Sequence, residues 1–407
     1  MPLLLLLIFL TSSAFSQTAT NASESGVGDN KPITLKQWHE KINIRGYAQV
    51  RYNRLLESNN KFTSSSTDRS LGDKQGLFLR RARLTFSGEV SDRVFIYIQP
   101  DYATEASTAT NSNQASPSQN YFQIRDAYFD YNLTMNKEWR IRTGISKIPF
   151  GFSNLQSSSN RAPLDRDDAL NTGTPNERDT GIFLMYTPSE LKKRFKELTN
   201  NNLKGTGDYG MISIGAYNGQ TLNRREENND LHRALRITYP FKLGNGQFIE
   251  ASLQGYEGMF ETDGNGRSGG KDFYDQRSAA SLIVYPQPLG FQLEYNHGRG
   301  PEFDVSSNKI ASREVKGGYA QVNYQIYHQD QRFFPYVRFQ EYAGGRKLES
   351  GSPTSRVREW EMGSEWQPDP SFELTLAYAM ADRYLRSAAA KTHEDGQMLR
   401  VQAQFNY

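Results

Sequence analysis

The sequence contains no cysteine, which excludes a disulfide scaffold, a cysteine-ligated zinc site and thiol catalysis. Histidine is scarce as well: the five residues, at positions 39, 232, 297, 328 and 393, show no metal-ligand spacing. We therefore expect neither a metal nor a cofactor. The 48 basic and 45 acidic residues leave a net charge of only +3, which gives no indication of a nucleic-acid partner.

Long hydrophobic runs are almost absent too. The one clear run, Leu3 to Leu10, is too short to span a membrane, and Ala14 and Ser16 follow it at signal-peptidase spacing. We predict a signal peptide over residues 1–16, a polar periplasmic lead-in over 17–41, and one barrel domain over 42–407. Nothing after residue 17 approaches the apolar length of a membrane-spanning helix, so none is expected.

Alternation of apolar and polar residues dominates the rest of the chain. In INIRGYAQVRYN, residues 42–53, the side chains of Ile44, Ala48 and Val50 alternate with polar ones, as in a strand with one wet face. Most such runs have ten or more residues, which suits tilted strands that cross a bilayer, since soluble strands usually have about five or six. Sixteen strands are predicted, at 42–56, 76–90, 93–103, 121–132, 139–147, 180–188, 209–218, 231–240, 247–258, 273–285, 290–299, 314–328, 332–342, 356–367, 372–384 and 396–407.

The connections between these runs alternate in length. The short ones include 91–92, 286–289 and 329–331, and the long ones 104–120, 300–313 and 343–355. Short periplasmic turns and long extracellular loops are typical of outer-membrane barrels. The connection 189–208 does not fit, because it falls on the short side yet could hold a helical turn or two. It indicates either a periplasmic elaboration or a strand count that is off by two.

The last predicted strand ends on the aromatic Tyr407, where the interfacial girdle of a membrane barrel is expected. The mean hydropathy of −0.72 does not oppose this reading, because only alternate residues of such a strand meet lipid. The predicted fold class is therefore all-β: a transmembrane antiparallel β-barrel of about sixteen strands, embedded in the outer-membrane lipid of a Gram-negative bacterium.

Arginine outnumbers lysine by 31 to 17, and three arginines crowd into FLRRARLTFSGEV, residues 78–90. By strand alternation Arg81 and Arg83 point into a water-filled lumen, whereas Arg80 falls on the lipid side, where it would reach for head groups. The same parity predicts further lumen arginines at Arg45, Arg51, Arg93, Arg140 and Arg142. The alternative is that these residues are only the polar filling that any porin lumen needs.

Acidic residues take the inward parity on later strands, at Glu250, Glu294, Glu359, Glu361, Glu365 and Glu373. A basic wall along the first five strands would then face an acidic wall, and the transverse field between them would orient dipolar solutes. Basic residues gathered at the narrowest section would select anions instead.

The narrowest section is expected in the long segment after the fifth strand, which we call the constriction loop. A loop of this length is usually functional, and folded into the lumen it would set charges against the arginine wall. The alternative is an external loop with solvated charges. Its charged residues, with those that border it, are Lys147, Arg161, Arg166 and Arg178, and Asp165, Asp167, Asp168, Glu177 and Asp179.

RGYAQVRY at 45–52, LRRARLTFSG at 79–88, IRDAYFDY at 124–131 and GISKIPFGF at 144–152 resemble the phosphate-selective porin O and P family. The resemblance covers most of the chain after the signal peptide and is sharpest over its first third. It implies a sixteen-stranded homotrimeric barrel that conducts anions past an arginine ladder, with phosphate or polyphosphate as the solute. It also implies ladder or constriction roles for Arg45, Arg51, Arg81, Arg83, Arg140, Arg142 and Lys147.

The leading hypothesis is a passive outer-membrane channel for small anions such as phosphate, selected by an arginine-lined lumen. No nucleophile has a base neighbour in the sequence, so catalysis is not expected. Three alternatives stay open: a general-diffusion porin with a mixed-charge lumen, a secreted β-rich enzyme or glycan-binding protein that uses the acidic loop, and an adhesive or purely structural surface barrel that conducts nothing.

Overall fold

The computed structural model describes residues 38–58, 76–104, 120–262, 272–387 and 391–407. The predicted signal peptide and nearly all of the predicted lead-in lie outside the described residues, as does most of the connection 104–120. The described chain begins with a short 3-10 helix, η1 (Trp38–Lys41), and enters the first strand at Ile42.

The described residues form seventeen strands in one sheet. The strands are β1 (Ile42–Ser58), β2 (Gly76–Glu89), β3 (Val94–Thr104), β4 (Asn120–Asn132), β5 (Trp139–Lys147), β6 (Arg178–Tyr186), β7 (Ile212–Tyr217), β8 (His232–Lys242), β9 (Phe248–Glu261), β10 (Asp272–Val284), β11 (Leu289–Asp304), β12 (Lys309–Tyr324), β13 (Ile326–His328), β14 (Gln331–Gly345), β15 (Thr354–Asp369), β16 (Phe372–Arg386) and β17 (Lys391–Asn406).

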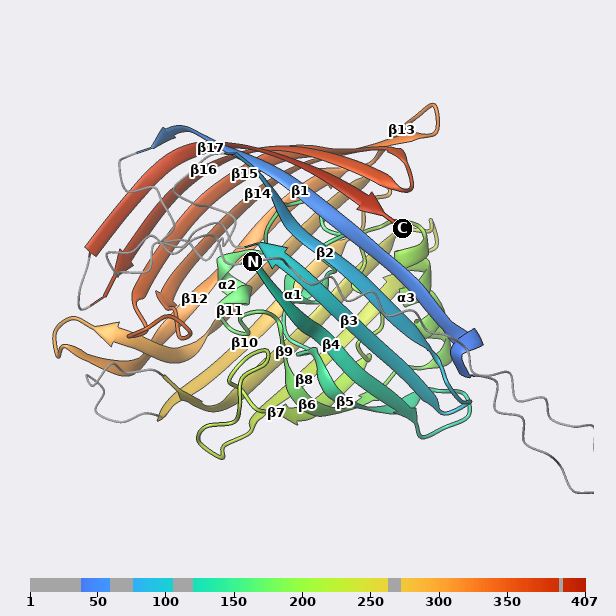
Figure 1. Ribbon diagram of the computed structural model, residues 1–407, viewed down its shortest axis with the longest axis horizontal. Helices are drawn as coiled ribbons and strands as arrows, with labels where there is room; N and C mark the ends of the chain where they lie inside the picture. Colours follow the sequence, from blue (N-terminus) through green and yellow to red (C-terminus); the bar gives the residue numbers. More distant parts are fainter. Residues whose placement is uncertain (1–37, 59–75, 105–119, 263–271, 388–390) are drawn as a thin grey trace, which may run out of the picture. The chain divides into compact units, whose positions relative to one another are not determined.

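The sheet is a closed up-and-down barrel (Figure 1). Each strand runs antiparallel to its neighbours in sequence, and β17 returns to pair with β1 from Tyr47↔Asn406 to Ser58↔Gly396. Strands β12 and β13 both pair with β14, one after the other, and together form one interrupted strand of the barrel. The barrel therefore has sixteen strands, as predicted. At the seam, the backbone of Gly46 exchanges hydrogen bonds with that of Tyr407, and a Cβ at Gly46 would lie 2.5 Å from the Tyr407 ring.

The burial pattern of the strands is inverted relative to a soluble protein. In β8 the polar Arg236 and Thr238 are buried, whereas Leu235, Ile237 and Tyr239 are exposed. The same holds around the barrel, since large exposed apolar side chains recur on every second position of most strands. A continuous apolar exterior of this kind is unfavourable in water and stable against lipid acyl chains.

The β11–β12 hairpin is longer than predicted. Residues 300–304 and 309–313 belong to β11 and β12 and pair up to Asp304↔Lys309, so only four residues, 305–308, connect them. The prediction of a long loop at 300–313 is therefore wrong. This stretch carries too few apolar residues to show an alternation in the sequence, although the backbone pairing continues through it.

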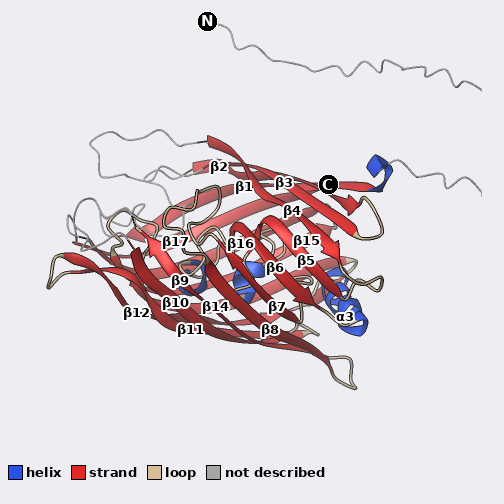
Figure 2. Ribbon diagram, turned by 90° about the horizontal axis from the view of Figure 1, so that it is seen from below, coloured by secondary structure: helices blue, strands red, loops and turns tan. Residues whose placement is uncertain are grey.

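The connection between β6 and β7 holds a helix, α3 (Ser189–Asn200), so the misfit in the loop pattern comes from an elaboration and not from a wrong strand count. Figure 2 shows α3 at one end of the ring of strands. Leu191, Phe195 and Leu198 share one helical face and pack with Phe152 of the constriction loop. None of the helices in the described chain is long and apolar enough to cross a membrane.

The constriction loop, residues 148–177, joins β5 to β6 and carries two single-turn helices, α1 (Phe152–Leu155) and α2 (Asp168–Asn171). Both lie inside the ring of strands (Figures 1 and 2). Phe150, Ala169 and Leu170 pack against inward side chains of β6 through β15, which fixes the loop to one half of the wall.

Candidate functional site

The RRAR segment departs from simple alternation. Gln49 of β1 pairs with Arg81 and Val50 with Leu79, so Arg80 is an extra residue, a β-bulge. The bulge turns Arg80 inward, where its guanidinium lies 3.8 Å from a carboxylate oxygen of Asp165. The prediction that Arg80 faces lipid is therefore wrong, and all three arginines of the segment face the lumen.

Three inward-facing arginines of β1 and β2, Arg51, Arg81 and Arg83, have different partners. Arg51 is fully buried and forms a 2.8 Å ion pair with Asp165. Arg83 makes a two-pronged contact with Asp101, at 2.8 and 3.1 Å, and donates to the Tyr47 hydroxyl. Arg81 donates to the hydroxyl of Ser158, at 2.6 Å, and forms no ion pair within the described chain.

The basic residues of β5 form hydrogen bonds within the barrel wall and with the start of the constriction loop. Arg142 bonds both carboxylate oxygens of Asp130, at 2.7 and 2.8 Å, and Arg140 bonds Asp208 at 3.0 Å. Lys147 donates to the backbone carbonyls of Leu155 and Gln156, so its ammonium closes the first turn of the constriction loop. These three are buried but already have acceptors.

The constriction loop crosses the lumen from its base at β5 and β6. On one side, Glu294 of β11 accepts hydrogen bonds from the backbone N–H groups of Phe152 and Ser153, at 2.6 and 3.1 Å. On the other side, the Gln49 amide of β1 donates to the Ser158 carbonyl. The loop thus touches strands far from its own, and residues around Ser158 lie against the arginines of β1 and β2.

Asp165, on this loop, gathers arginines from three strands. Its carboxylate contacts Arg51 of β1, Arg400 of β17 and, more distantly, Arg80 of β2. Burial alone would raise the pKa of the Asp165 carboxyl, but these guanidiniums hold it well below its ordinary value. Asp165 is therefore ionised at any working pH.

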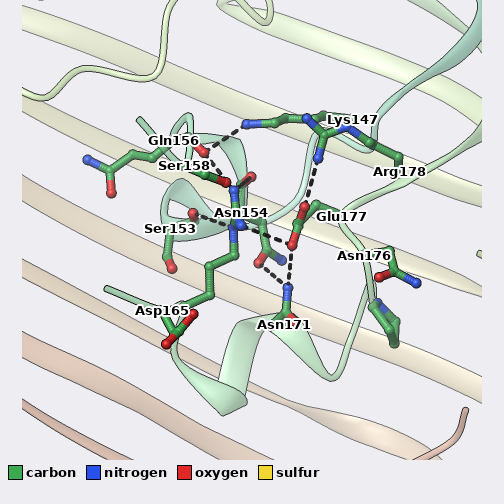
Figure 3. A network of polar contacts seen from close by, with 12 residues as sticks. Lys147, Ser153, Asn154, Gln156, Ser158, Asp165, Asn171, Asn176, Glu177 and Arg178 are labelled. Carbon is green, nitrogen blue, oxygen red and sulfur yellow. Dashed lines mark hydrogen bonds and ion pairs between the residues drawn. The ribbon is translucent and has the colours of Figure 1, made fainter. Parts of the chain in front are cut away.

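Glu177 is the second carboxylate of the loop, after Asp165, that contacts several arginines. Figure 3 shows it between Arg178, 2.7 Å away, and the Asn171 amide. Arg125 and Arg166 also bond it, at 2.9 and 3.0 Å. Against the cost of burial, Arg166, Arg125 and Arg178 hold the pKa of Glu177 well below its ordinary value. These contacts tie the outgoing end of the loop to β4 and β6.

The remaining predicted loop residues bind the loop to itself. Arg161 donates to the carbonyls of Pro163 and Leu164, and Arg166 also donates to the Gln156 carbonyl. The Asp168 carboxylate forms no ion pair within the described residues, and burial raises its pKa to about 6.

Two predicted lumen residues lie elsewhere. Arg93 is exposed in the turn before β3 and donates to the Leu133 carbonyl of the next turn at that end, so the prediction that it lines the lumen is wrong. The predicted strand began one residue too early. Arg45 shares the inward face of β1 with Tyr47 but is exposed, near the end where β1 begins.

The expected separation of a basic wall from an acidic wall is also wrong. Acids face the lumen beside the first arginines, as Asp101 and Asp130 do, and the later strands carry buried arginines that sequence reasoning did not single out. These include Arg236, Arg277, Arg338, Arg383 and Arg400, and Arg125 of β4 is a further buried arginine of this kind. Most have a carboxylate next to them, for example Arg236 with Glu250 at 3.0 Å. The alternation of side chains along each strand could have identified these arginines as inward-facing.

The family comparison agrees with this geometry. Phosphate-selective porin O and P matches residues 59–274 and 268–407. The chain belongs to this family. None of the curated proteins compared with the porin matches its sequence.

Solved outer-membrane porins share the fold. OmpF of Salmonella typhi, in complex with daunomycin, is 14% identical, with 91% of this chain and 98% of that chain covered and a TM-score of 0.56. The outer-membrane channel DcaP of Acinetobacter baumannii is also 14% identical, with 90% and 97% covered and a TM-score of 0.51. An anion-selective porin from Comamonas acidovorans is 9% identical, with 90% and 99% covered and a TM-score of 0.50.

The protein is therefore an outer-membrane porin. The secreted, β-rich enzyme or glycan-binding protein that the sequence left open does not fit a closed barrel with an apolar exterior. What passes through the lumen depends on the charges around the constriction loop.

Proposed function

We propose that this porin is a passive channel that favours small anions, with phosphate as the candidate solute, and that the arginines facing the constriction loop select them. The observation that carries the proposal is Arg81. Its guanidinium is 4% exposed, bonds only the Ser158 hydroxyl and forms no ion pair in the described chain. A buried cation without a carboxylate is unfavourable, and a passing anion would supply the missing charge.

The surroundings of Arg81 reinforce this preference. Arg51 and Arg80 both approach the carboxylate of Asp165, so several guanidiniums lie together on the β1–β2 side of the constriction. Guanidiniums offer anions a fork of N–H donors and stay charged at any working pH. Several weak sites in a row would let an anion enter and leave, each worth on the order of 1 kcal/mol in wet surroundings.

A general-diffusion porin is the second candidate, and the ion pairs favour it. Arg83 with Asp101, Arg142 with Asp130 and Arg236 with Glu250 are each balanced, so much of the lumen is neutral at short range. In that case the channel would discriminate by size and show nearly equal permeability to chloride and potassium.

The test is reconstitution in a planar bilayer under a KCl gradient, followed by addition of phosphate. The proposal predicts a reversal potential on the chloride side, block by phosphate, and a weaker chloride preference in Arg81→Gln. The matched control is the double variant Asp130→Asn with Arg142→Gln, which removes a balanced pair and should leave selectivity unchanged. A weakly selective wild-type pore that phosphate does not block would favour general diffusion.

We also propose that the porin is a homotrimer. The family resemblance supports this, as does OmpT of Vibrio cholerae, described as a trimer form, which is 9% identical with 90% of this chain and 99% of that chain covered and a TM-score of 0.50. Cross-linking of the detergent-solubilised porin before and after heating should give a threefold mass that collapses to the monomer. A single monomer band throughout would contradict the trimer.

A further inference from the structure

The Asp165 carboxylate lies among guanidiniums that project from three strands of the barrel wall. Arg51 and Arg400 contact one of its oxygens, Oδ2, and Arg80 approaches the other, Oδ1, at 3.8 Å. These arginines come from β1, β17 and β2, and β1 lies between the other two strands in the barrel. A carboxylate held by a fork of guanidiniums is the arrangement in which proteins also hold small oxyanions.

We infer that Asp165 is a tethered counter-ion: it occupies the place between Arg51 and Arg400 that a permeating anion would take, and so limits how tightly the porin binds its solute. The inference rests on the proposed anion preference and names the residue that tunes it. A solute anion meets these guanidiniums only in competition with a carboxylate that cannot diffuse away. Such competition keeps a site weak enough for release, which conduction requires.

The tether does not depend on the carboxylate alone. Arg51 also donates to the Leu164 carbonyl at 3.0 Å, and Arg338 of β14 donates to the backbone carbonyl of Asp165 at 2.8 Å. The Leu164 N–H donates to Glu361 of β15 at 3.2 Å. Three contacts to the main chain of the loop, from β1, β14 and β15, thus hold this part of the loop when the charge is removed, so the charge can be tested apart from the loop position.

The experiment compares wild type with Asp165→Asn and Asp165→Glu in planar bilayers, with inorganic phosphate titrated against the chloride current. Asp165→Asn removes the competing charge and keeps the side-chain shape. Asp165→Glu keeps the charge. Glu190→Gln serves as the control for net charge, because Glu190 lies on the exposed face of α3, away from the loop arginines.

The inference predicts that Asp165→Asn lowers the half-blocking phosphate concentration about fivefold, the size expected for one charge at contact distance in wet surroundings. Asp165→Glu should stay within about twofold of wild type, as should Glu190→Gln. Unchanged or weaker block in Asp165→Asn would overturn the inference. Equal effects of Asp165→Asn and Asp165→Glu would overturn it too, because the loop shape and not the charge would then be responsible.

Failure of the proposed function gives a different result. If wild type shows no chloride preference and no phosphate block, the proposed function fails. A chloride preference that appears in Asp165→Asn alone would then still support the counter-ion role, since removal of the tethered charge would have opened the site.

Discussion

The ammonium of Lys204 lies 2.6 Å from a carboxylate oxygen of Glu365, and this contact joins the connection after α3 to β15. Both side chains are almost fully buried, at 3% and 2% exposure. The same connection accepts a hydrogen bond from the Gln156 amide at the Lys204 carbonyl and one from Asn160 at the Gly205 carbonyl. Two insertions, one from each end of the barrel, therefore meet in the lumen and brace each other.

We predict that Lys204→Met destabilises the porin by about 3 kcal/mol, because removal of one partner leaves the Glu365 charge buried without compensation. The double variant Lys204→Met with Glu365→Gln should recover most of that loss. Urea unfolding in lipid vesicles measures both. The control is Lys193→Met, whose partner Glu190 is exposed, and which should cost no more than about 0.5 kcal/mol. Equal losses at the two lysines would contradict the brace.

The Asp168 carboxyl predicts a pH-dependent selectivity. Burial raises its pKa to about 6, against the opposing effect of the Arg383 and Arg346 guanidiniums, with Glu359 and Asp167 adding to the rise. Asp168 is therefore neutral at pH 5 and charged at pH 7.5, so the chloride-to-potassium permeability ratio should fall over this interval. Because the folded state holds this proton between the ordinary pKa and about 6, its contribution to stability also falls as the pH rises through that window.

The measurement is the reversal potential at the two pH values in wild type and Asp168→Asn. The variant keeps a neutral side chain at both values, so it should lose part of the pH effect. An identical pH response in the two proteins would contradict the assignment and point to other buried carboxyls.

Glu294 predicts how the constriction loop is held. Its carboxyl group accepts hydrogen bonds from the Phe152 and Ser153 N–H groups, and hydrogen bonds of this kind contribute about 0.5–1.5 kcal/mol each. Glu294→Ala should release the start of the loop and raise the single-channel conductance and its fluctuations. Glu314→Ala on the neighbouring strand is the control, because that side chain is 56% exposed. Unchanged conductance in Glu294→Ala would show that the packing of Phe152 and the other contacts of the loop hold it without Glu294.

Strand alternation predicted the barrel and most inward-facing residues, because a two-residue period decides which face of a strand is buried. It could not predict which charges meet. Asp165 and Arg400 are 235 residues apart, and only the closure of β17 on β1 and the path of the loop bring them together. It also failed at 300–313, where the strands continue through a stretch that has too few apolar residues to show the period.

The bulge at Arg80 could not be predicted from the sequence either, and it leads to the last prediction. Nothing in FLRRARLTF distinguishes a regular strand from one with an extra residue; only the pairing with β1, where Gln49 meets Arg81 and Val50 meets Leu79, reveals it. Since the chain has no cysteine, a single introduced thiol is unique. Arg80→Cys should react with a charged, membrane-impermeant thiosulfonate added to porin in vesicles, whereas Leu79→Cys, on the lipid side of the strand, should not.

The reaction is followed by the mass of the intact protein, and an uncharged, lipid-soluble maleimide provides the comparison. That reagent should modify Leu79→Cys, which shows that the thiol is present and reactive. If Leu79→Cys reacts with the charged reagent and Arg80→Cys does not, the strand alternates regularly through this segment, and Arg80 belongs to the lipid face after all. Because Arg80 lies 3.8 Å from Asp165 only through the bulge, that result would also remove one of the three guanidiniums from the anion site.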